Sequence, residues 1–201
     1  MSEPINKIPK DEELIQSTLM GDADAYGQLV IRYQQRLYNS LVQLMRDTIE
    51  AEDATQEAFV LALRKLDSFR GQSSFFTWLY RIAFNSAVSR MRKKRPDLTS
   101  HQDMSKLEEW KGSSSELPED RLNREENVLL VQTALGRLNE EHRAILVLRE
   151  IDEMSYEDLS RVLDLPIGTV RSRLHRARLQ LKQEIEFLMN HPKQSTTSSK
   201  K

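Results

Sequence analysis

The chain has 201 residues, of which 38% are hydrophobic, and it carries a net charge of −1 and no cysteine. The length allows one or two domains, and the hydrophobic fraction is sufficient for a buried core. The absence of cysteine excludes disulfides and thiolate metal sites within this chain. No N-terminal apolar segment or long apolar run is present, so we expect a cytoplasmic protein that does not insert into a membrane.

Charge is unevenly distributed along the chain. The stretch from Arg81 to Arg95 is basic without any acidic residue, and so is the stretch 168–182. Acidic residues gather instead between Asp47 and Glu57, and again over 103–126. Two basic patches indicate two contacts with phosphate, and an acidic patch indicates a basic protein partner.

The N-terminal half has the pattern of consecutive helices. Residues 1–10 are polar, contain two prolines and are expected to be disordered. Over 11–95, apolar residues recur every three or four positions, which predicts helices almost throughout. The sequence Gly21-Asp22-Ala23-Asp24 interrupts this pattern, with Asp22 or Asp24 as a candidate N-cap. No alternation typical of strands is found, so the predicted fold class is all-α.

Further along the chain, we expect a third helix over 49–66, a loop over 67–73 and a fourth helix over 74–94, which Pro96 ends. The segment 96–122 is rich in acid, serine and glycine and is predicted to be a flexible linker.

Helical periodicity resumes near Asn123 and continues to about residue 189, before a polar tail over 190–201. The sequence therefore predicts two small helical domains, 11–95 and 123–189, joined by the linker.

Residues 155–178 predict two short helices around a tight turn. Ser155 and Asp158 form a capping pair, and Pro166 suits the first turn of the second helix. One side of that helix is an apolar stripe made of Val170, Leu174, Ala177 and Leu181. The other side carries Arg171, Ser172, His175 and Arg176, with Arg173 and Arg178 flanking them. This is the pattern of a helix-turn-helix recognition helix in a major groove. A solvated basic helix in a bundle is the alternative, but it does not explain the short capped helix before it.

Two stripes in the first domain are candidate binding surfaces. Asp53, Gln56 and Glu57 share one helix face, which in an arbitrary helix is more often simply solvated. Trp78, Asn85, Ser89 and Arg92 share a face of the fourth helix. Tryptophan is more often a core residue, but here it is followed by an amide, a hydroxyl and an arginine, which suit stacking on bases and binding phosphates. The adjacent loop carries Arg70 and Gly71 and is suited to hold an unstacked base.

Three segments of the first domain and three of the second resemble a known family. The first domain contains Glu52-Asp53-Ala54-Thr55-Gln56-Glu57-Ala58-Phe59, Leu66-Asp67-Ser68-Phe69-Arg70-Gly71 and Phe76-Thr77-Trp78-Leu79-Tyr80-Arg81-Ile82-Ala83-Phe84-Asn85. The second contains Leu148-Arg149-Glu150-Ile151-Asp152, Ser155-Tyr156-Glu157-Asp158-Leu159 and Pro166-Ile167-Gly168-Thr169-Val170-Arg171-Ser172-Arg173. These segments resemble regions 2 and 4 of bacterial RNA polymerase sigma factors of the extracytoplasmic-function (ECF) group, in the sigma-70 family.

The resemblance implies a transcription initiation factor that carries out no covalent chemistry and needs no metal or cofactor. Its implied partners are core RNA polymerase, promoter DNA and an anti-sigma factor. Asp53, Gln56 and Glu57 match the positions that dock on the coiled coil of the largest polymerase subunit. The face of Trp78, Asn85, Ser89 and Arg92 matches the one that reads the −10 element, and Phe69, Arg70 and Gly71 match the pocket for a flipped base. Arg171, Ser172, Arg173, His175 and Arg176 match the helix that reads the −35 element.

Two other functions compete with this interpretation. A helix-turn-helix regulator with a sensory or dimerising N-terminal domain would explain 123–188 but leaves the Trp78 stripe unused. A metal-dependent enzyme with Asp53 and Glu57 as ligands would need further ligands, yet the histidines at 101, 142, 175 and 191 do not converge with these acids in the sequence.

Overall fold

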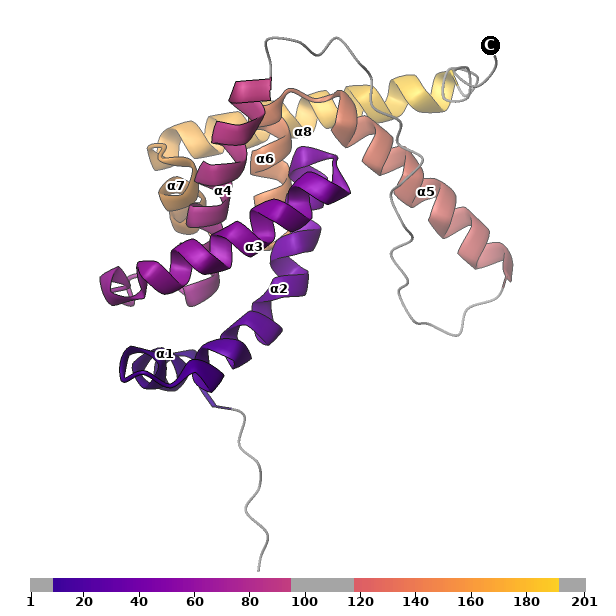
Figure 1. Cartoon of the computed structure of the whole chain (residues 1–201). Coiled ribbons are helices and arrows are strands. Elements are labelled where there is room, and N and C mark those ends of the chain that lie inside the picture. The colour runs from indigo at the N-terminus through magenta and orange to yellow at the C-terminus, as the bar shows by residue number, and fades with distance from the viewer. Residues whose placement is uncertain (1–8, 95–117, 192–201) are drawn as a thin grey trace, which may run out of the picture. The chain divides into compact units, whose positions relative to one another are not determined.

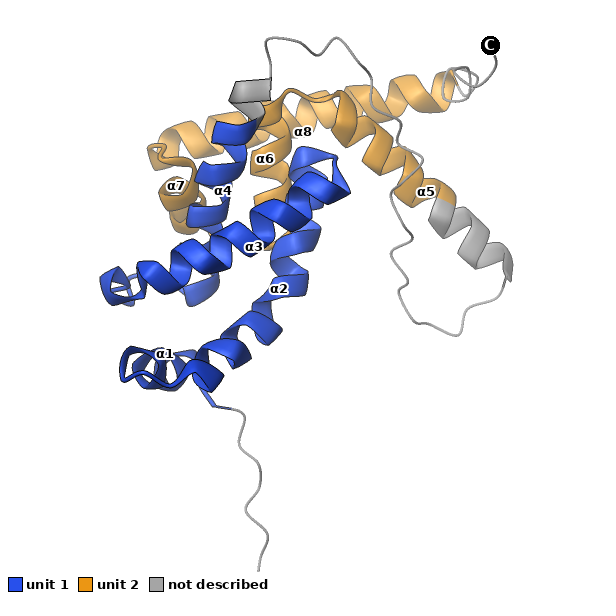
Figure 2. Cartoon of the chain, viewed as in Figure 1, with its two compact units in different colours: residues 1–99 blue, residues 100–201 orange. Residues whose placement is uncertain are grey.

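A computed structural model describes residues 9–94 and 118–191, which belong to two compact units. Unit 1 lies within residues 1–99 and unit 2 within residues 100–201 (Figures 1 and 2). The described residues of both units form helices and contain no strand. The predicted all-α fold class with two helical domains is therefore confirmed. Most of the N-terminal extension, of the expected linker and of the tail lies outside the described residues.

Unit 1 consists of four α-helices and one short 3-10 turn. The helices are α1 (Asp11–Leu19), α2 (Ala23–Met45), α3 (Thr48–Arg64) and α4 (Phe75–Lys94), with the 3-10 turn η1 (Leu66–Ser68) between α3 and α4. Asp22 caps α2, since its carboxylate accepts from the backbone N–H groups of Asp24 and Ala25 at 2.9 and 3.2 Å. Asp47 caps α3 in the same way.

Helices α3 and α4 pack against each other, and each of them buries alanines. Ala54 and Ala58 of α3 and Ala83 and Ala87 of α4 are completely buried. Because alanine side chains are short, two helix backbones that meet through them can lie close together. Larger side chains fill the rest of the core, among them Leu29, Leu37, Leu41, Leu66 and Leu79. This packing brings the outward sides of α3 and α4 next to each other.

The first helix is attached to the second by polar contacts. The carboxylate of Asp11 accepts hydrogen bonds from the guanidinium of Arg32 and the hydroxyl of Tyr33. Burial, reinforced by the neighbouring Asp11 carboxylate, raises the pKa of Tyr33 to about 12. The Tyr33 hydroxyl therefore stays protonated, and remains a donor to Asp11, throughout the physiological pH range.

Unit 2 consists of four α-helices and a π-helical turn. They are α5 (Pro118–Arg137), α6 (Glu140–Leu146), the π turn η3 (Val147–Ile151), α7 (Tyr156–Leu163) and α8 (Ile167–Asn190). Helix α5 begins five residues before the expected position near Asn123, because proline lacks an N–H and is well suited to the first position of a helix. Leu138, Ile145, Leu148, Leu159 and Leu174 are among the buried residues of this unit.

A buried arginine links α5 to α6. Arg143 is only 8% exposed, and its guanidinium donates to the backbone carbonyls of Leu135, Gly136 and Leu138 at 3.1, 3.2 and 2.8 Å. The last carbonyls of a helix have no partner within the helix, and a cation there is also favoured by the helix dipole. Arg143 thus satisfies the end of α5 from the neighbouring helix.

Replacing Arg143 by methionine should lower the free energy of unfolding of unit 2 by about 2–3 kcal/mol, since buried carbonyls lose charged donors. Hydrogen exchange of the full chain, followed by mass spectrometry, measures this as faster exchange in α5 and α6. Peptides from unit 1 provide an internal control and should exchange at an unchanged rate. Arg143→Lys, which keeps the charge but has fewer directed donors, should give an intermediate rate. Unchanged protection of α5 in Arg143→Met would contradict this role.

Candidate functional site

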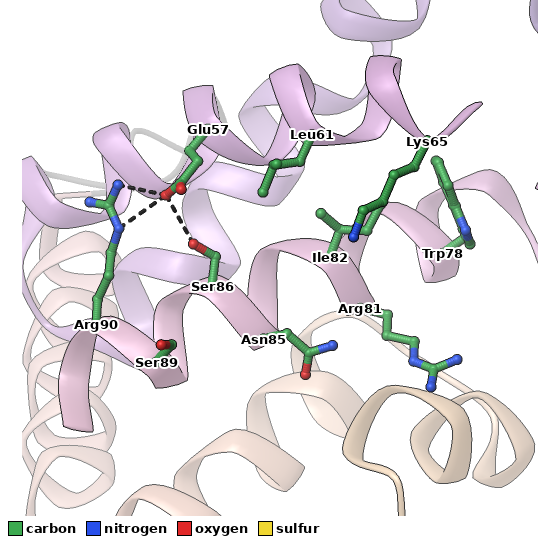
Figure 3. A pocket seen from close by; sticks show the side chains of 10 residues that line it. All are labelled: Glu57, Leu61, Lys65, Trp78, Arg81, Ile82, Asn85, Ser86, Ser89 and Arg90. Carbon is green, nitrogen blue, oxygen red and sulfur yellow. Dashed lines mark hydrogen bonds and ion pairs between the residues drawn. The ribbon is translucent and has the colours of Figure 1, made fainter. Parts of the chain in front are cut away.

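A groove of about 590 Å³ lies between α3 and α4 on the surface of unit 1 (Figure 3). It combines apolar, aromatic, amide, hydroxyl and charged side chains. Its lining residues are Glu57, Leu61, Lys65, Trp78, Arg81, Ile82, Asn85, Ser86, Ser89 and Arg90. The groove therefore brings Trp78, Asn85 and Ser89 from the predicted α4 stripe together with residues of α3.

One end of the groove is closed by a charged cluster. Glu57 Oε2 accepts from Ser86 Oγ at 2.9 Å and from Arg90 Nε and Nη2 at 3.1 and 2.6 Å (Figure 3). These bonds join α3 to α4 at the level of the buried alanines. Glu57 therefore faces α4, whereas Asp53 and Gln56 are exposed on α3. Of the three residues of the predicted acidic stripe, Glu57 thus lines the groove, while Asp53 and Gln56 are exposed and do not line it.

The opposite end of the groove is aromatic. Trp78 is partly exposed and lies 5.4 Å from Phe69 and 5.8 Å from Phe75, measured between ring centroids. Phe75 is buried and also meets the edge of Phe69. The indole of Trp78 is consequently held by two phenylalanine rings while part of it stays accessible, which is the arrangement required for stacking on a base.

The loop before α4 has defined geometry. Ser74 caps α4, because its hydroxyl accepts from the backbone N–H of Thr77 at 3.0 Å. Gly71 has φ +67°, a left-handed conformation that favours glycine, and Arg70 and Gly71 are both exposed. Of the three loop residues predicted to bind a flipped base, Phe69 supports Trp78, while Arg70 and Gly71 face solvent.

The groove adds residues that the sequence analysis did not single out, above all Lys65 and Arg81. Asn85 and Ser89 are exposed, as a binding role for this face requires. Arg92 falls in the last turn of α4, and its side chain lies outside the described part of the structure.

Side-chain hydrogen bonds define both the start of α7 and the turn between α7 and α8 in unit 2. The Ser155 hydroxyl accepts from the backbone N–H of Asp158 at 3.0 Å and donates to the Asp158 carboxylate at 2.8 Å. The carboxylate thus binds the hydroxyl, and not the backbone N–H that a capping box uses. Asp164 adopts a left-handed φ of 53° at the end of α7, and Ser160 Oγ donates to the Leu165 carbonyl at 2.5 Å. The Ser155 bonds thus cap α7, whereas the Asp164 conformation and the Ser160 bond lie in the turn from which α8 starts.

Helix α8 presents the expected basic face. Val170, Leu174 and Ala177 are buried, while Leu181 at the end of the predicted stripe is only partly buried. The residues of the predicted recognition face are exposed, namely Arg171, Ser172, His175 and Arg176.

Two flanking arginines of α8 form ion pairs within unit 2. Arg173 lies 3.2 Å from a carboxylate oxygen of Glu141 and is partly buried. Arg178 lies 2.6 Å from Glu150, and these hydrogen bonds raise the pKa of its guanidinium. The resemblance assigns Arg173 to DNA binding, and in the structure its guanidinium also pairs with Glu141 of α6.

Comparisons with known proteins agree with this geometry. The family model described as Sigma-70 region 2 matches residues 29–96, and Sigma-70, region 4 matches residues 129–181. The RNA polymerase sigma-H factor of Pseudomonas aeruginosa is 38% identical over 189 residues, covering 90% of this chain and 96% of the relative. The ECF RNA polymerase sigma-E factor of Escherichia coli K12 is 38% identical over 185 residues, covering 89% and 96%.

Solved structures show the same fold. The structure of CnrH in complex with the cytosolic domain of CnrY has a TM-score of 0.65 and 26% identity, and it covers 88% of this chain and 97% of that one. The sigma factor RpoE of Bartonella quintana, solved with the anti-sigma factor NepR, has a TM-score of 0.61 at 24% identity and covers 80% and 96%.

The chain belongs to the ECF RNA polymerase sigma factors of the sigma-70 family. The match of residues 29–96 to region 2 favours this assignment over a helix-turn-helix regulator with a sensory or dimerising N-terminal domain. Within 9–94 and 118–191, no group of three histidine or acidic residues is placed to hold a metal ion. None of the helices in these ranges is both long and apolar enough to cross a bilayer.

The Glu57 cluster leads to a stability prediction. Glu57→Ala should lower the free energy of unfolding of unit 1 by up to about 1 kcal/mol, because its ion pair is partly exposed and screened by solvent. Urea unfolding followed by Trp78 fluorescence, in a Trp110→Phe background, measures the change. Asp53→Ala, one turn earlier on the exposed side of α3, is the matched control and should leave the midpoint in place. Equal midpoint shifts for the two variants would count against a special role of Glu57.

Proposed function

We propose that the chain directs core RNA polymerase to a subset of promoters and helps to open the DNA there. Its family membership supports this function. Each unit also has a surface whose side chains are suited to binding nucleic acid. The observation that carries the proposal is the groove of unit 1, where a supported tryptophan is followed along α4 by Asn85 and Ser89. This chemistry suits a single strand better than a duplex, because the face of an indole can stack only on an unstacked base.

Unit 2 reads the −35 element through α8. Arg171, Ser172, His175 and Arg176 reach the base edges of the major groove, where arginine pairs with guanine and histidine can donate or accept. The bond from Ser160 to the Leu165 carbonyl in the preceding turn helps to keep this helix at a constant angle, as recognition of a specific site requires.

Unit 1 reads the −10 element and captures a base as the strands separate. Trp78, Asn85, Ser89 and Arg92 contact the single strand, with Arg70 and Gly71 beside the flipped base and Phe69 holding Trp78 in position. Unstacking a base costs a few kcal/mol, which stacking and phosphate contacts in this unit offset.

Asp53 and Gln56 dock on the coiled coil of the largest polymerase subunit; both are exposed on α3 and do not line the groove, which leaves them accessible to a protein partner. Glu57 acts mainly by holding α4 in position. An anti-sigma factor is a further partner, by analogy with the complexes of CnrH and of the Bartonella RpoE. The chain acts by binding, with no covalent step of its own, in the cytoplasm where bacterial polymerase works.

Run-off transcription tests the function as a whole. Purified chain mixed with core polymerase should initiate transcription from a subset of fragments in a genomic promoter library, whereas core polymerase alone should not. Arg176→Ala should weaken binding to the recovered promoters by about 1–3 kcal/mol and relax the sequence preference at one −35 position. Arg161→Ala is the control, since Arg161 is exposed on α7 and pairs with Asp158 at 3.1 Å. Failure of the wild-type chain to confer initiation would refute the proposal.

Asn85→Ala separates melting from polymerase binding. It should reduce the yield of open complex, measured by permanganate reactivity of unpaired thymines, while the affinity for core polymerase stays unchanged. Asp53→Lys should have the reverse effect and weaken polymerase binding, because it reverses a charge facing a basic partner. If both variants lost both activities to the same extent, the separate roles assigned to α3 and α4 would be wrong.

A further inference from the structure

The groove of unit 1 contains a lysine whose position suggests a specific task. Lys65 follows α3 directly, and its side chain extends toward α4 with its nitrogen beside Ile82, while Trp78 lies on the other side of the lysine stem (Figure 3). Its carbonyl accepts from the backbone N–H and the hydroxyl of Ser68, at 2.9 and 2.6 Å, which anchors the backbone from which the side chain starts. Among the described residues, no acidic group forms an ion pair with its ammonium.

The surroundings of Lys65 divide the groove into two parts. At the far end, Glu57 and Arg90 are bonded to each other, so their charges are already compensated. Between that end and Trp78, the groove is lined by the apolar side chains of Leu61 and Ile82. A base that stacks on Trp78 would lie over this apolar part with one edge facing the Lys65 ammonium.

The ammonium discriminates between the edges that a base can present. Lysine offers three donors and no acceptor, so it favours a keto oxygen. At the position of guanine O6 and thymine O4, adenine and cytosine carry an amino group, which cannot accept from an ammonium; N7 is an acceptor in both purines and does not discriminate between them. Asn85 is less selective, because an amide both donates and accepts.

We propose that Lys65 is a specificity-determining residue that makes the groove select a keto base, guanine or thymine, in the melted strand. This inference rests on the proposed function, in which unit 1 captures an unstacked base. It adds the chemical class of that base and a residue that neither the sequence analysis nor the resemblance assigned to DNA.

The test uses the assembled polymerase holoenzyme. Promoters recovered in the run-off experiment are prepared with an unpaired non-template strand, and each unpaired position is replaced in turn by the four bases. The wild-type holoenzyme should bind the guanine or thymine substrates at one position about tenfold more tightly than the adenine or cytosine substrates. Lys65→Met, which keeps the length of the side chain, should abolish this preference. Arg64→Met removes the neighbouring charge, which does not line the groove, and should retain it.

The outcomes separate three explanations. Loss of the keto preference in Lys65→Met alone supports the proposal. An equal loss of affinity for all four bases in Lys65→Met, with a smaller dependence on salt, would mean a phosphate contact and would overturn it. A wild-type preference for adenine or cytosine at every position, or none at all, would overturn it while leaving the proposed function intact. Only the absence of any binding above that of core polymerase would overturn both.

Discussion

The close packing of α3 against α4 determines what unit 1 can present to a partner. Both helices bury alanines, and the bonds from Ser86 and Arg90 to Glu57 join them at one end of the groove. The groove lies between the two helices, while Asp53 and Gln56 stay exposed on α3. In the proposed function this pair of helices therefore offers one surface to a protein and another to a single strand.

For unit 2 the requirement is different: in the proposed function, α8 must be held at a constant angle to a duplex. The turn before α8 is short and contains the bond from Ser160 to the Leu165 carbonyl, while Ser155 caps the start of α7. Arg143 extends this rigidity to α5 by satisfying carbonyls at its end. A recognition helix supported in this way loses little conformational entropy when it binds, so more of its contact energy remains for discrimination between sequences.

Much of the fold could be predicted from the sequence because helical periodicity and caps are local signals. Asp22 as a cap and the buried stripe from Val170 to Ala177 follow from neighbouring residues alone. The site was predictable only as a set of exposed faces. The bond from Glu57 to Arg90 joins positions 33 apart in the sequence, and no local pattern reveals it. The same holds for Phe69 against Trp78 and for the place of Lys65, which depend on how η1 folds back.

The ion pairs on α8 affect how the chain behaves on DNA that it does not recognise. Glu141 and Glu150 neutralise Arg173 and Arg178 from within the unit. Attraction to an arbitrary duplex grows with the number of cations available for phosphates, so these two acids lower the affinity for unrelated sequences. In the proposed complex the base contacts use Arg171 and Arg176, which are exposed, so the affinity for a correctly aligned site falls less. We therefore expect the two glutamates to widen the difference in affinity between target and unrelated sequences.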